Sequence, residues 1–542
     1  MRPGERLIAS DGDLQRASGT HSLMASTGRL DPDGFLDLAR EATASGEPLD
    51  VECPFTGEVF ARVPRSTPED VREAFRRARR AQPGWAALSF RERGEVFLRF
   101  HDRLLERREE LLDLVQLEAG KARLHVFEEL LDAAIVARYY AHTAGRHLKS
   151  RRRQGAIPLL TSTVQHRHPV GAVGFIVPWN YPLTLAITDA IPAMMAGNAA
   201  VIKPDHKTPL TALWLARLLR GCGLPRDLVQ IVPGEGGTVG ERLVEEADFV
   251  MFTGSTETGR RVAAKAAGRL VGSSMELGGK NPMIVFEDAD LDRTVEGAIR
   301  ACFASAGQLC ISAERLYVHA AVYDRFLPRF VDRTRNLRLG PGLDYSSEMG
   351  SLVSAAQLER VRSHVEEAVE GGARVLAGGR PRPDLGPYFY EPTILTGVRE
   401  GMAPFSEETF GPVVSVYRFH TPEEAVSLAN ATRYGLNASL WTRSTRWAEQ
   451  EIAPRIQAGT VNINEAYAAS WASTDSPMGG FKDSGLGRRH GEEGITKYTE
   501  SQTVTTQRLI PLVAPFAGIE GRAYEHLMVF SIRLLRHLPG IK

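Results

Sequence analysis

Three residues have side chains that could together carry out acyl chemistry. Cys310 lies in "FASAGQLCISAER", Glu276 precedes two glycines in "MELGGKNP", and Asn180 ends "FIVPWN". A thiolate attacks a carbonyl carbon, an amide N–H stabilises the resulting oxyanion, and a carboxylate deprotonates an attacking water. Each residue alone has an ordinary alternative, since free cysteine is often a packing residue and asparagine often a turn residue. Together they predict an enzyme that forms and hydrolyses a thioester.

Two further motifs suit a dehydrogenase. In "FTGSTETG", Gly254 and Ser255 form a turn that opens a helix, whose N–H groups can contact a pyrophosphate. "EETFGPV" (407–413) is the second motif. "PGEGGTVG" (233–240) lacks a G-x-G-x-x-G pattern and is a weak dinucleotide fingerprint.

Short apolar runs alternate with helical stretches along most of the chain. "GAVGFIVPW", "AAVIKP", "LVQIVPG", "FVMFTG" and "NPMIVF" are typical of buried strands that each lead into a turn and a helix. A second series follows Cys310, with "ARVLAGG", "PVVSVYRF", "ASLWT" and "GTVNIN". From Thr67, a good N-cap before Pro68, helical patterns run to about residue 146. The pattern predicts an α/β protein with two parallel-sheet domains and a cleft between them.

Composition narrows the class of protein. The 542 residues carry equal numbers of acidic and basic side chains, which gives no support to nucleic-acid binding. The four cysteines (Cys53, Cys222, Cys302 and Cys310) form no C-x-x-C pair, which fits a reducing cytoplasm. We find no signal peptide, no run long enough for a membrane span, and no metal-ligand set.

These motifs resemble those of the aldehyde dehydrogenase superfamily, in the family's order, over roughly residues 45–505. The resemblance implies that Cys310 is the nucleophile and Glu276 the general base. It also implies that Asn180 holds the substrate oxygen together with the backbone N–H of Cys310. It assigns the cofactor to Lys203 (adenosine ribose), His206, Gly254, Ser255, Glu408, Phe410, Pro178, Trp179 and Leu277. Cys302, eight residues before the nucleophile, matches no catalytic position and is predicted to be a core residue.

The family's mechanism would then apply to this chain. The thiolate adds to the aldehyde to give a thiohemiacetal, hydride leaves for the nicotinamide, and Glu276 activates the water that hydrolyses the thioester. A CoA-acylating relative needs no such base, so Glu276 argues against that alternative. A non-enzymatic protein that kept the fold would need none of the three catalytic residues.

The resemblance also implies a division of the chain. A Rossmann-like dinucleotide-binding domain and a catalytic domain carry a β oligomerisation arm, which predicts a homodimer or tetramer. The expected segments are a loose leader (1–45), the dinucleotide-binding domain (46–149 and 168–277), the catalytic domain (278–487), the arm (150–167 and 488–510) and a helical tail (511–542).

One departure from the family concerns the cofactor. Many NAD-using members carry Glu three residues after the lysine matched by Lys203, and its carboxylate repels a 2′-phosphate. Here that position is His206, with Lys207 beside it. We therefore expect NADP to be preferred, with NAD also accepted; the alternative is that His206 is an exposed loop residue and both cofactors bind.

The substrate is less constrained. Several stretches, among them "SPMGGFKDSGLGRRHGEEGI", are most similar to a bacterial succinate-semialdehyde dehydrogenase branch. Some members of that class carry Arg eight or nine residues after the catalytic Asn, where this chain has Thr188 and Asp189. Asp189 would repel a substrate carboxylate if it faced the tunnel. The alternative is a broad medium-chain or aromatic aldehyde dehydrogenase.

The chain continues well beyond "TKYTESQTVTTQ", near which such enzymes usually finish. Its tail predicts an amphipathic helix that ends at Pro539 and Gly540. The apolar side holds Tyr524, Leu527, Met528, Leu535 and Leu538, and His526, Arg533, Arg536 and His537 lie opposite. The interpretations are packing on its own body or on a dimer mate, a lid over the tunnel, or peripheral contact with a membrane.

Overall fold

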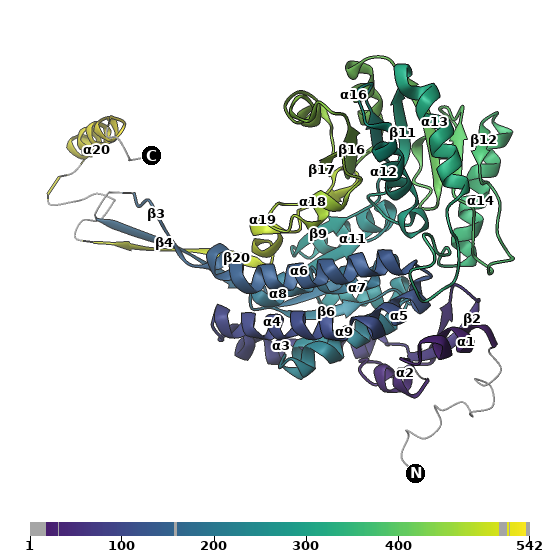
Figure 1. Cartoon of the computed structure of the whole chain (residues 1–542). Helices are drawn as coiled ribbons and strands as arrows, with labels where there is room; N and C mark the ends of the chain where they lie inside the picture. Colours follow the sequence, from purple (N-terminus) through teal and green to yellow (C-terminus); the bar gives the residue numbers. More distant parts are fainter. Residues whose placement is uncertain (1–17, 31, 157–159, 509–517, 520, 538–542) are drawn as a thin grey trace, which may run out of the picture.

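The computed structural model describes residues 18–30, 32–156, 160–508, 518–519 and 521–537. Two α/β units lie one above the other in Figure 1, and a narrow β arm extends from the lower unit. Each unit is built on its own mainly parallel sheet, which confirms the predicted fold class.

The first sheet has six strands in the order β19-β9-β8-β5-β6-β7. The strands are β5 (Ala172–Ile176), β6 (Ala199–Lys203), β7 (Val229–Ile231), β8 (Phe249–Thr253), β9 (Gly272–Glu276) and β19 (Gly485–Leu486). The central strands β5, β6 and β8 are buried at every residue, because helices cover both faces of a parallel sheet. The edge strand β19 comes from far along the chain and runs antiparallel to β9.

Helices surround this sheet. Thr67 caps α3 through a capping box with Asp70, and Pro68 occupies the first turn, as the sequence predicts. The helices are α3 (Pro68–Ala86), α4 (Phe90–Glu106), α5 (Arg108–Ala119), α6 (Arg123–Leu148), α7 (Pro182–Ile187), α8 (Ala190–Met195), α9 (Pro209–Gly221), α10 (Glu241–Glu246), α11 (Thr256–Gly268) and α19 (Gly491–Thr496).

The second sheet has seven strands in the order β12-β13-β14-β11-β10-β16-β17. They are β10 (Asn281–Val285), β11 (Ala313–His319), β12 (Arg374–Ala377), β13 (Thr393–Thr396), β14 (Val413–Phe419), β16 (Asn437–Trp441) and β17 (Thr460–Ile463). Only the edge strand β12 runs antiparallel to its neighbour. The helices of this unit include α12 (Leu291–Phe303), α13 (Ala320–Arg335), α14 (Ala355–Glu370), α16 (Pro422–Asn430) and α18 (Ala468–Ala472).

The arm is a three-stranded antiparallel sheet in the order β20-β4-β3. It consists of β3 (Arg151–Arg153), β4 (Thr161–Pro169) and β20 (Thr499–Gln507). Almost every residue of β20 is exposed. Beyond the arm in Figure 1 lies α20 (Gly521–Leu535). Among the described residues, no helix is both long enough and apolar enough to cross a membrane.

The described part of the N-terminal segment is not the loose leader that its composition predicts. It forms α1 (Ser18–Thr27) and α2 (Pro32–Ala39), followed by the hairpin of β1 (Pro48–Cys53) and β2 (Glu58–Pro64). Phe35 is buried and packs edge-on against Phe60, with ring centroids 5.3 Å apart. Arg29 pairs with the buried Asp113 of α5 at 2.8 Å. These contacts join distant parts of the chain, so composition alone could not reveal them; residues 1–17 lie outside the described residues.

Candidate active site

One wall of the site is formed where the parallel strands of the first sheet end. Asn180 follows β5, Gly254 and Ser255 follow β8, and Glu276 is the last residue of β9. Thr253 pairs with Glu276 in register, so these strand ends lie side by side. The carboxyl ends of parallel strands are where α/β sheets bind ligands.

The opposite wall comes from the amino ends of two neighbouring strands in the second sheet. Cys310 lies three residues before β11, and Phe410 lies three residues before β14. Arg315 and Ser415 pair in register, which brings the two loops together. The carboxyl edge of one sheet therefore faces the amino edge of the other.

A cavity of about 260 Å³ lies between the two walls. It brings together ten of the twelve site residues predicted from sequence, namely Cys310, Glu276, Asn180, Gly254, Ser255, Glu408, Phe410, Pro178, Trp179 and Leu277. Thr253, Gly278, Gln357 and Arg360 complete its lining. No cluster of His, Cys, Asp and Glu suited to a metal ion occurs among the described residues.

Two glycines after Glu276 let the walls approach each other. A Cβ on Gly278 would lie 2.5 Å from a carboxylate oxygen of Glu408, and one on Gly279 would lie 2.4 Å from the backbone oxygen of Cys310. A side chain at position 279 would collide with backbone, and one at position 278 would require the Glu408 carboxylate to move. The "ELGG" motif is thus explained by the tight approach of the loops that carry Cys310 and Glu408.

Cys310 differs from the other cysteines in its exposure. It is half-buried and lines the cavity, whereas Cys53, Cys222 and Cys302 are buried. Burial, reinforced by the nearby carboxylates of Glu408 and Glu276, raises the pKa of the Cys310 thiol to about 12, and Arg489 opposes the shift. The thiol is therefore protonated at rest and needs a base to become a nucleophile.

Asn180 is held beside the loop of Cys310. Its side-chain amide donates to the backbone oxygen of Gln308 at 3.0 Å. Its own backbone oxygen accepts from the buried Lys121 at 3.1 Å, and Lys121 pairs with the buried Glu129. An asparagine amide has two N–H donors, and the side chain lines the cavity next to Cys310. This placement suits a donor to an oxygen that develops charge.

Glu276 is buried, and its Oε1 atom has no hydrogen-bond partner among the described residues. Desolvation raises the pKa of this carboxyl to about 7, while Arg489, Lys497 and Arg488 lower it and Asp189 raises it. A carboxyl with a pKa near the working pH can both accept and release a proton. The group is therefore suited to act as a general base.

Asp189 belongs to a buried charge cluster beside Glu276. Its Oδ2 atom accepts from Arg489 at 2.6 Å, and its Oδ1 atom lies 3.6 Å from the Nζ atom of Lys497. Lys497 also donates to Ser274 on β9, two residues before Glu276, at 3.3 Å. Asp189 is 2% exposed, does not line the cavity, and is neutralised by two cations. The repulsion that sequence reasoning considered therefore does not arise.

A second hydrogen-bond network holds the predicted nicotinamide side of the cavity. The Glu408 carboxylate accepts from the backbone N–H of Gly279 at 2.8 Å, and its backbone oxygen accepts from Arg360 at 2.6 Å. Burial and the neighbouring Glu314 raise the pKa of Glu408 to about 8. Phe410 has a left-handed φ of 55° and packs edge-on against Trp179 at 5.5 Å. Such strain in a non-glycine residue is typical of functional sites.

A second cavity of about 230 Å³ lies between α10 and α11. Ile176 and Phe252 form its floor, and Gly236, Gly237, Gly240, Arg261 and Lys265 are among its lining residues. Lys203 pairs in register with Ile176 and is buried, although it does not line either cavity. Half-exposed His206 also lies off both cavities.

The loop after Lys203 places the negative charge of Asp205 next to His206, the residue predicted to lie near a 2′-phosphate of the cofactor. The Asp205 carboxylate lies 3.3 Å from Nδ1 of His206 and 3.6 Å from Nζ of Lys207. Burial lowers the pKa of His206, which keeps the ring neutral. Lys207 is therefore the cation available to a 2′-phosphate, and Asp205 offsets part of its charge.

The two cavities fit a dinucleotide. Ser255 caps α11 by accepting from the N–H of Thr258, so the amino end of a 13-residue helix opens beside Gly254. A Cβ on Gly254 would lie 2.6 Å from the ring of Phe252, so only glycine leaves room here for the turn. A pyrophosphate at this turn would join an adenosine in the second cavity to a nicotinamide in the first.

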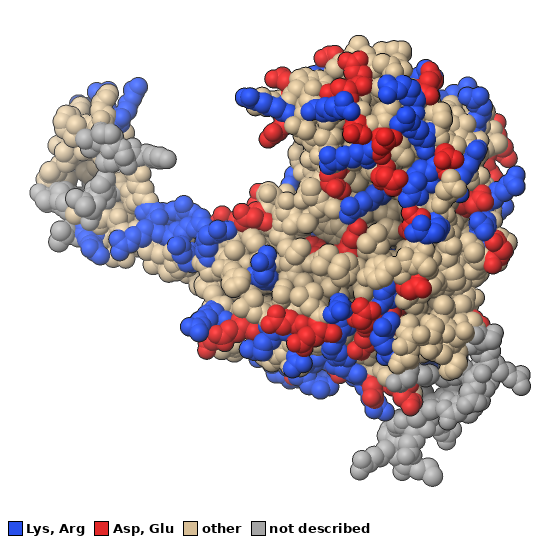
Figure 2. Space-filling view, viewed as in Figure 1, with Lys and Arg blue, Asp and Glu red and all other residues tan. Residues whose placement is uncertain are grey.

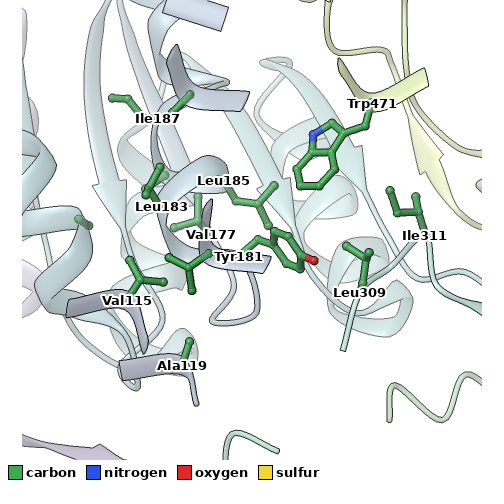
Figure 3. Packing of buried hydrophobic residues seen from close by; sticks show 14 of the residues in the cluster. Val115, Ala119, Val177, Tyr181, Leu183, Leu185, Ile187, Leu309, Ile311 and Trp471 are labelled. Carbon is green, nitrogen blue, oxygen red and sulfur yellow. The ribbon is translucent and has the colours of Figure 1, made fainter. Parts of the chain in front are cut away.

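Apolar residues adjoin Cys310 and Asn180 in the sequence. Figure 3 shows Leu309 and Ile311, the sequence neighbours of Cys310, near Tyr181, Leu185 and Trp471 in the core. The rings of Tyr181 and Trp471 meet edge-on at 5.4 Å. All five residues are buried in the hydrophobic core, and none of them lines the cavity.

Comparison with known proteins identifies the family. Residues 41–504 match the Aldehyde dehydrogenase family. The chain belongs to this family. It is therefore an NAD(P)-dependent aldehyde dehydrogenase, as the sequence predicts.

Three similar aldehyde dehydrogenases illustrate the relationship. A Mycolicibacterium smegmatis protein named "Putative succinate-semialdehyde dehydrogenase [NADP(+)]" is 51% identical over 490 residues, which cover 90% of this chain and 94% of that protein. Betaine aldehyde dehydrogenase of Bacillus subtilis is 39% identical over 462 residues (83% and 92%). The structure of a betaine aldehyde dehydrogenase from Staphylococcus aureus, in complex with NAD+ and with a BME-modified cysteine, superposes with a TM-score of 0.82 at 34% identity (87% and 95%).

The sequence analysis did not predict several residues of this aldehyde dehydrogenase site that lie far from its motifs along the chain. Gln357 and Arg360 lie on α14, in the middle of an ordinary amphipathic pattern. The cations Arg489 and Lys497 follow "SGLG" without any motif of their own. Three of the four glycines of "PGEGGTVG", Gly236, Gly237 and Gly240, line the second cavity.

Proposed function

We propose that this aldehyde dehydrogenase oxidises succinate semialdehyde to succinate, with NADP as the preferred cofactor. The observation that carries the catalytic part is the convergence of Cys310, Asn180 and Glu276 on one cavity. The substrate is supported by 51% identity to a protein named for this activity, and by the pairing of Asp189, which removes the expected repulsion of a carboxylate.

The roles of the chain's own residues follow from their chemistry. Glu276, whose pKa is about 7, accepts the thiol proton directly or through water, and the Cys310 thiolate then adds to the aldehyde carbon. The Asn180 amide and the backbone N–H of Cys310 donate to the oxyanion of the thiohemiacetal. Bound NAD(P) would supply the acceptor for the hydride that leaves this carbon. Glu276, once it has released the thiol proton to solvent, deprotonates the water that hydrolyses the Cys310 thioester, and the carboxylic acid departs as the thiolate re-forms.

Cofactor binding is assigned to both cavities. Gly254 and Ser255 contact the pyrophosphate, Lys203 the adenosine ribose, and Glu408 and Phe410 the nicotinamide ribose and ring. Pro178, Trp179 and Leu277 complete the nicotinamide pocket. His206 lacks the charge that would exclude a 2′-phosphate and Lys207 favours one, which supports NADP over NAD.

A panel of aldehydes assayed with both cofactors tests this proposal. The absorbance of the reduced cofactor reports the rate. We expect the highest kcat/KM for succinate semialdehyde with NADP. The apolar neighbours of the catalytic residues in the sequence, Tyr181 after Asn180 and Ile311 after Cys310, support a second candidate, a medium-chain or aromatic aldehyde. A higher kcat/KM for benzaldehyde or hexanal than for succinate semialdehyde would establish that alternative.

We also propose that the enzyme is a cytoplasmic homodimer or dimer of dimers that assembles through the arm. The long exposed face of β20 would be costly without a covering partner. Light scattering of the purified chain, and of a variant without residues 499–507, would test the arm's role. A monomeric wild-type chain would contradict it.

A further inference from the structure

Helix α20 has two chemically different sides. With 100° per residue, one broad arc carries Ala523, Tyr524, Leu527, Met528, Phe530, Ile532, Leu534 and Leu535. The narrower arc carries Arg522, Glu525, His526, Arg533, Arg536 and His537, with Val529 as its one large apolar residue. The predicted amphipathic helix is thus present and extends further on its apolar side than expected; Leu538, Pro539 and Gly540 lie outside the described residues.

The apolar arc is not covered by the rest of the chain. None of the residues of α20 is buried. The exposed fractions are 64% for Phe530, 63% for Ile532 and 51% for Leu534. Figure 1 shows α20 beyond the arm, away from both α/β units. The structure therefore does not show α20 packed on the rest of its own chain. So large an exposed apolar surface indicates a partner.

The surroundings of α20 are strongly basic. Figure 2 shows blue side chains along the arm that leads to the helix. Seven arginines lie on the arm strands and on residues 521–537, against two acidic residues, Glu500 and Glu525. The arginines are Arg151, Arg152, Arg153, Arg167, Arg522, Arg533 and Arg536. The whole chain has no net charge, so positive charge is concentrated at this end of the molecule.

We propose that α20 docks the enzyme on an anionic phospholipid surface. A helix with a wide apolar arc and a cationic polar arc lies in the plane of the bilayer interface, with its apolar side chains among the acyl chains and its arginines among the headgroups. Its 15 residues are too few to span the hydrocarbon core.

A second copy of the chain is the other occupant to consider. Two equivalent arms that met at α20 would bring two sets of arginines together, and this repulsion opposes association. An anionic lipid surface neutralises the same charges. Charge complementarity therefore favours the membrane.

Vesicle co-sedimentation of the full-length enzyme tests the proposal. Vesicles of phosphatidylcholine alone are compared with vesicles of equal parts phosphatidylcholine and phosphatidylglycerol. We expect binding to the anionic vesicles that weakens with salt. Removing Arg533 and Arg536 (R533Q/R536Q) should weaken binding by about fivefold per arginine.

Phe530 and Leu534 provide the test of the apolar arc. F530Q/L534Q should lose at least about tenfold in vesicle affinity, since two buried side chains are lost from the interface. V529Q makes the same change on the polar arc and should stay within about threefold of the wild type. All variants should keep full activity on a small aldehyde, because α20 is far from the cavity.

Two results would overturn the proposal. One is a wild-type enzyme that does not sediment with anionic vesicles. The other is an F530Q/L534Q variant that binds anionic vesicles as well as the wild type does but dissociates into monomers in light scattering. That result would make the apolar arc a subunit interface.

Discussion

The guanidinium of Arg489 donates to the carboxylate of Asp189 at 2.6 Å, inside the protein and next to Glu276. Lys497 also lies beside Asp189, and the buried Asp132 interacts with both Arg489 and Asp189. Arg489 and Lys497 each stabilise the ionised form of Glu276 and offset part of the desolvation that raises its pKa. We infer that Arg489 is a positioning residue that acts through Glu276.

Replacing Arg489 by Gln should move the pH dependence of thioester hydrolysis. The pKa of Glu276 should rise above about 7, because a stabilising cation is lost. The base is active only when ionised, so the acidic limb of the deacylation rate should shift to higher pH. Single-turnover rates across pH measure the limb, and Arg489→Lys should restore much of the original profile.

The same change should destabilise the fold by about 3 kcal/mol, since Asp189 loses its closest partner in a buried site. Urea unfolding measures this cost separately from the pH profile. If Arg489→Gln lowers stability while the acidic limb stays in place, Arg489 is structural only.

Cys310 and Cys302 form a matched pair for testing the nucleophile. Cys310→Ala should abolish aldehyde oxidation and leave the fold intact, because it removes a single sulfur atom from a half-buried side chain that lines the cavity. Cys302→Ala should cost about 1–2 kcal/mol of stability by leaving a small void, with activity retained. Activity assays and thermal unfolding of both variants decide; an inactive Cys302 variant beside an active Cys310 variant would reverse the assignment.

His206 and Asp205 should change cofactor choice in opposite directions. His206→Glu should raise the KM for NADP by about tenfold or more relative to NAD, because a carboxylate would repel the 2′-phosphate. Asp205→Asn removes a charge that offsets Lys207 and should favour NADP further. Equal effects on both Michaelis constants in the two variants would show that this loop does not read the phosphate.

Gly278→Ala should reduce activity by at least about tenfold, because its Cβ would displace the Glu408 carboxylate. Gly268, at the end of α11, has no atom within 4 Å of a built Cβ and serves as the control. Steady-state rates and cofactor binding by fluorescence measure the effect. A fully active Gly278 variant would mean that the position of Glu408 does not matter for catalysis.

Most of the residues that line the cavity could be predicted from the sequence, because several of them lie at the ends of strands. Asn180 and Gly254 each follow a buried apolar run, whereas Glu276 ends β9, whose residues Gly272–Glu276 are mostly not apolar; adjacent parallel strands bring the three ends together. The pairing of Asp189 with Arg489 spans 300 residues, and no local pattern encodes it. Likewise, Phe35 and Arg29 acquire their burial and pairing only from distant partners. Local periodicity defines elements, whereas such contacts depend on the complete tertiary structure.

The measurement that tests the central claim most directly is the pre-steady-state time course of Glu276→Gln. If Cys310 forms a thioester that Glu276 hydrolyses, this variant should release close to one equivalent of reduced cofactor per active site in a burst, followed by turnover slowed by about a hundredfold or more. Mass spectrometry of the quenched enzyme should find the acyl group on Cys310. A variant that turns over at the wild-type rate, or a burst without an acylated Cys310, would contradict this account.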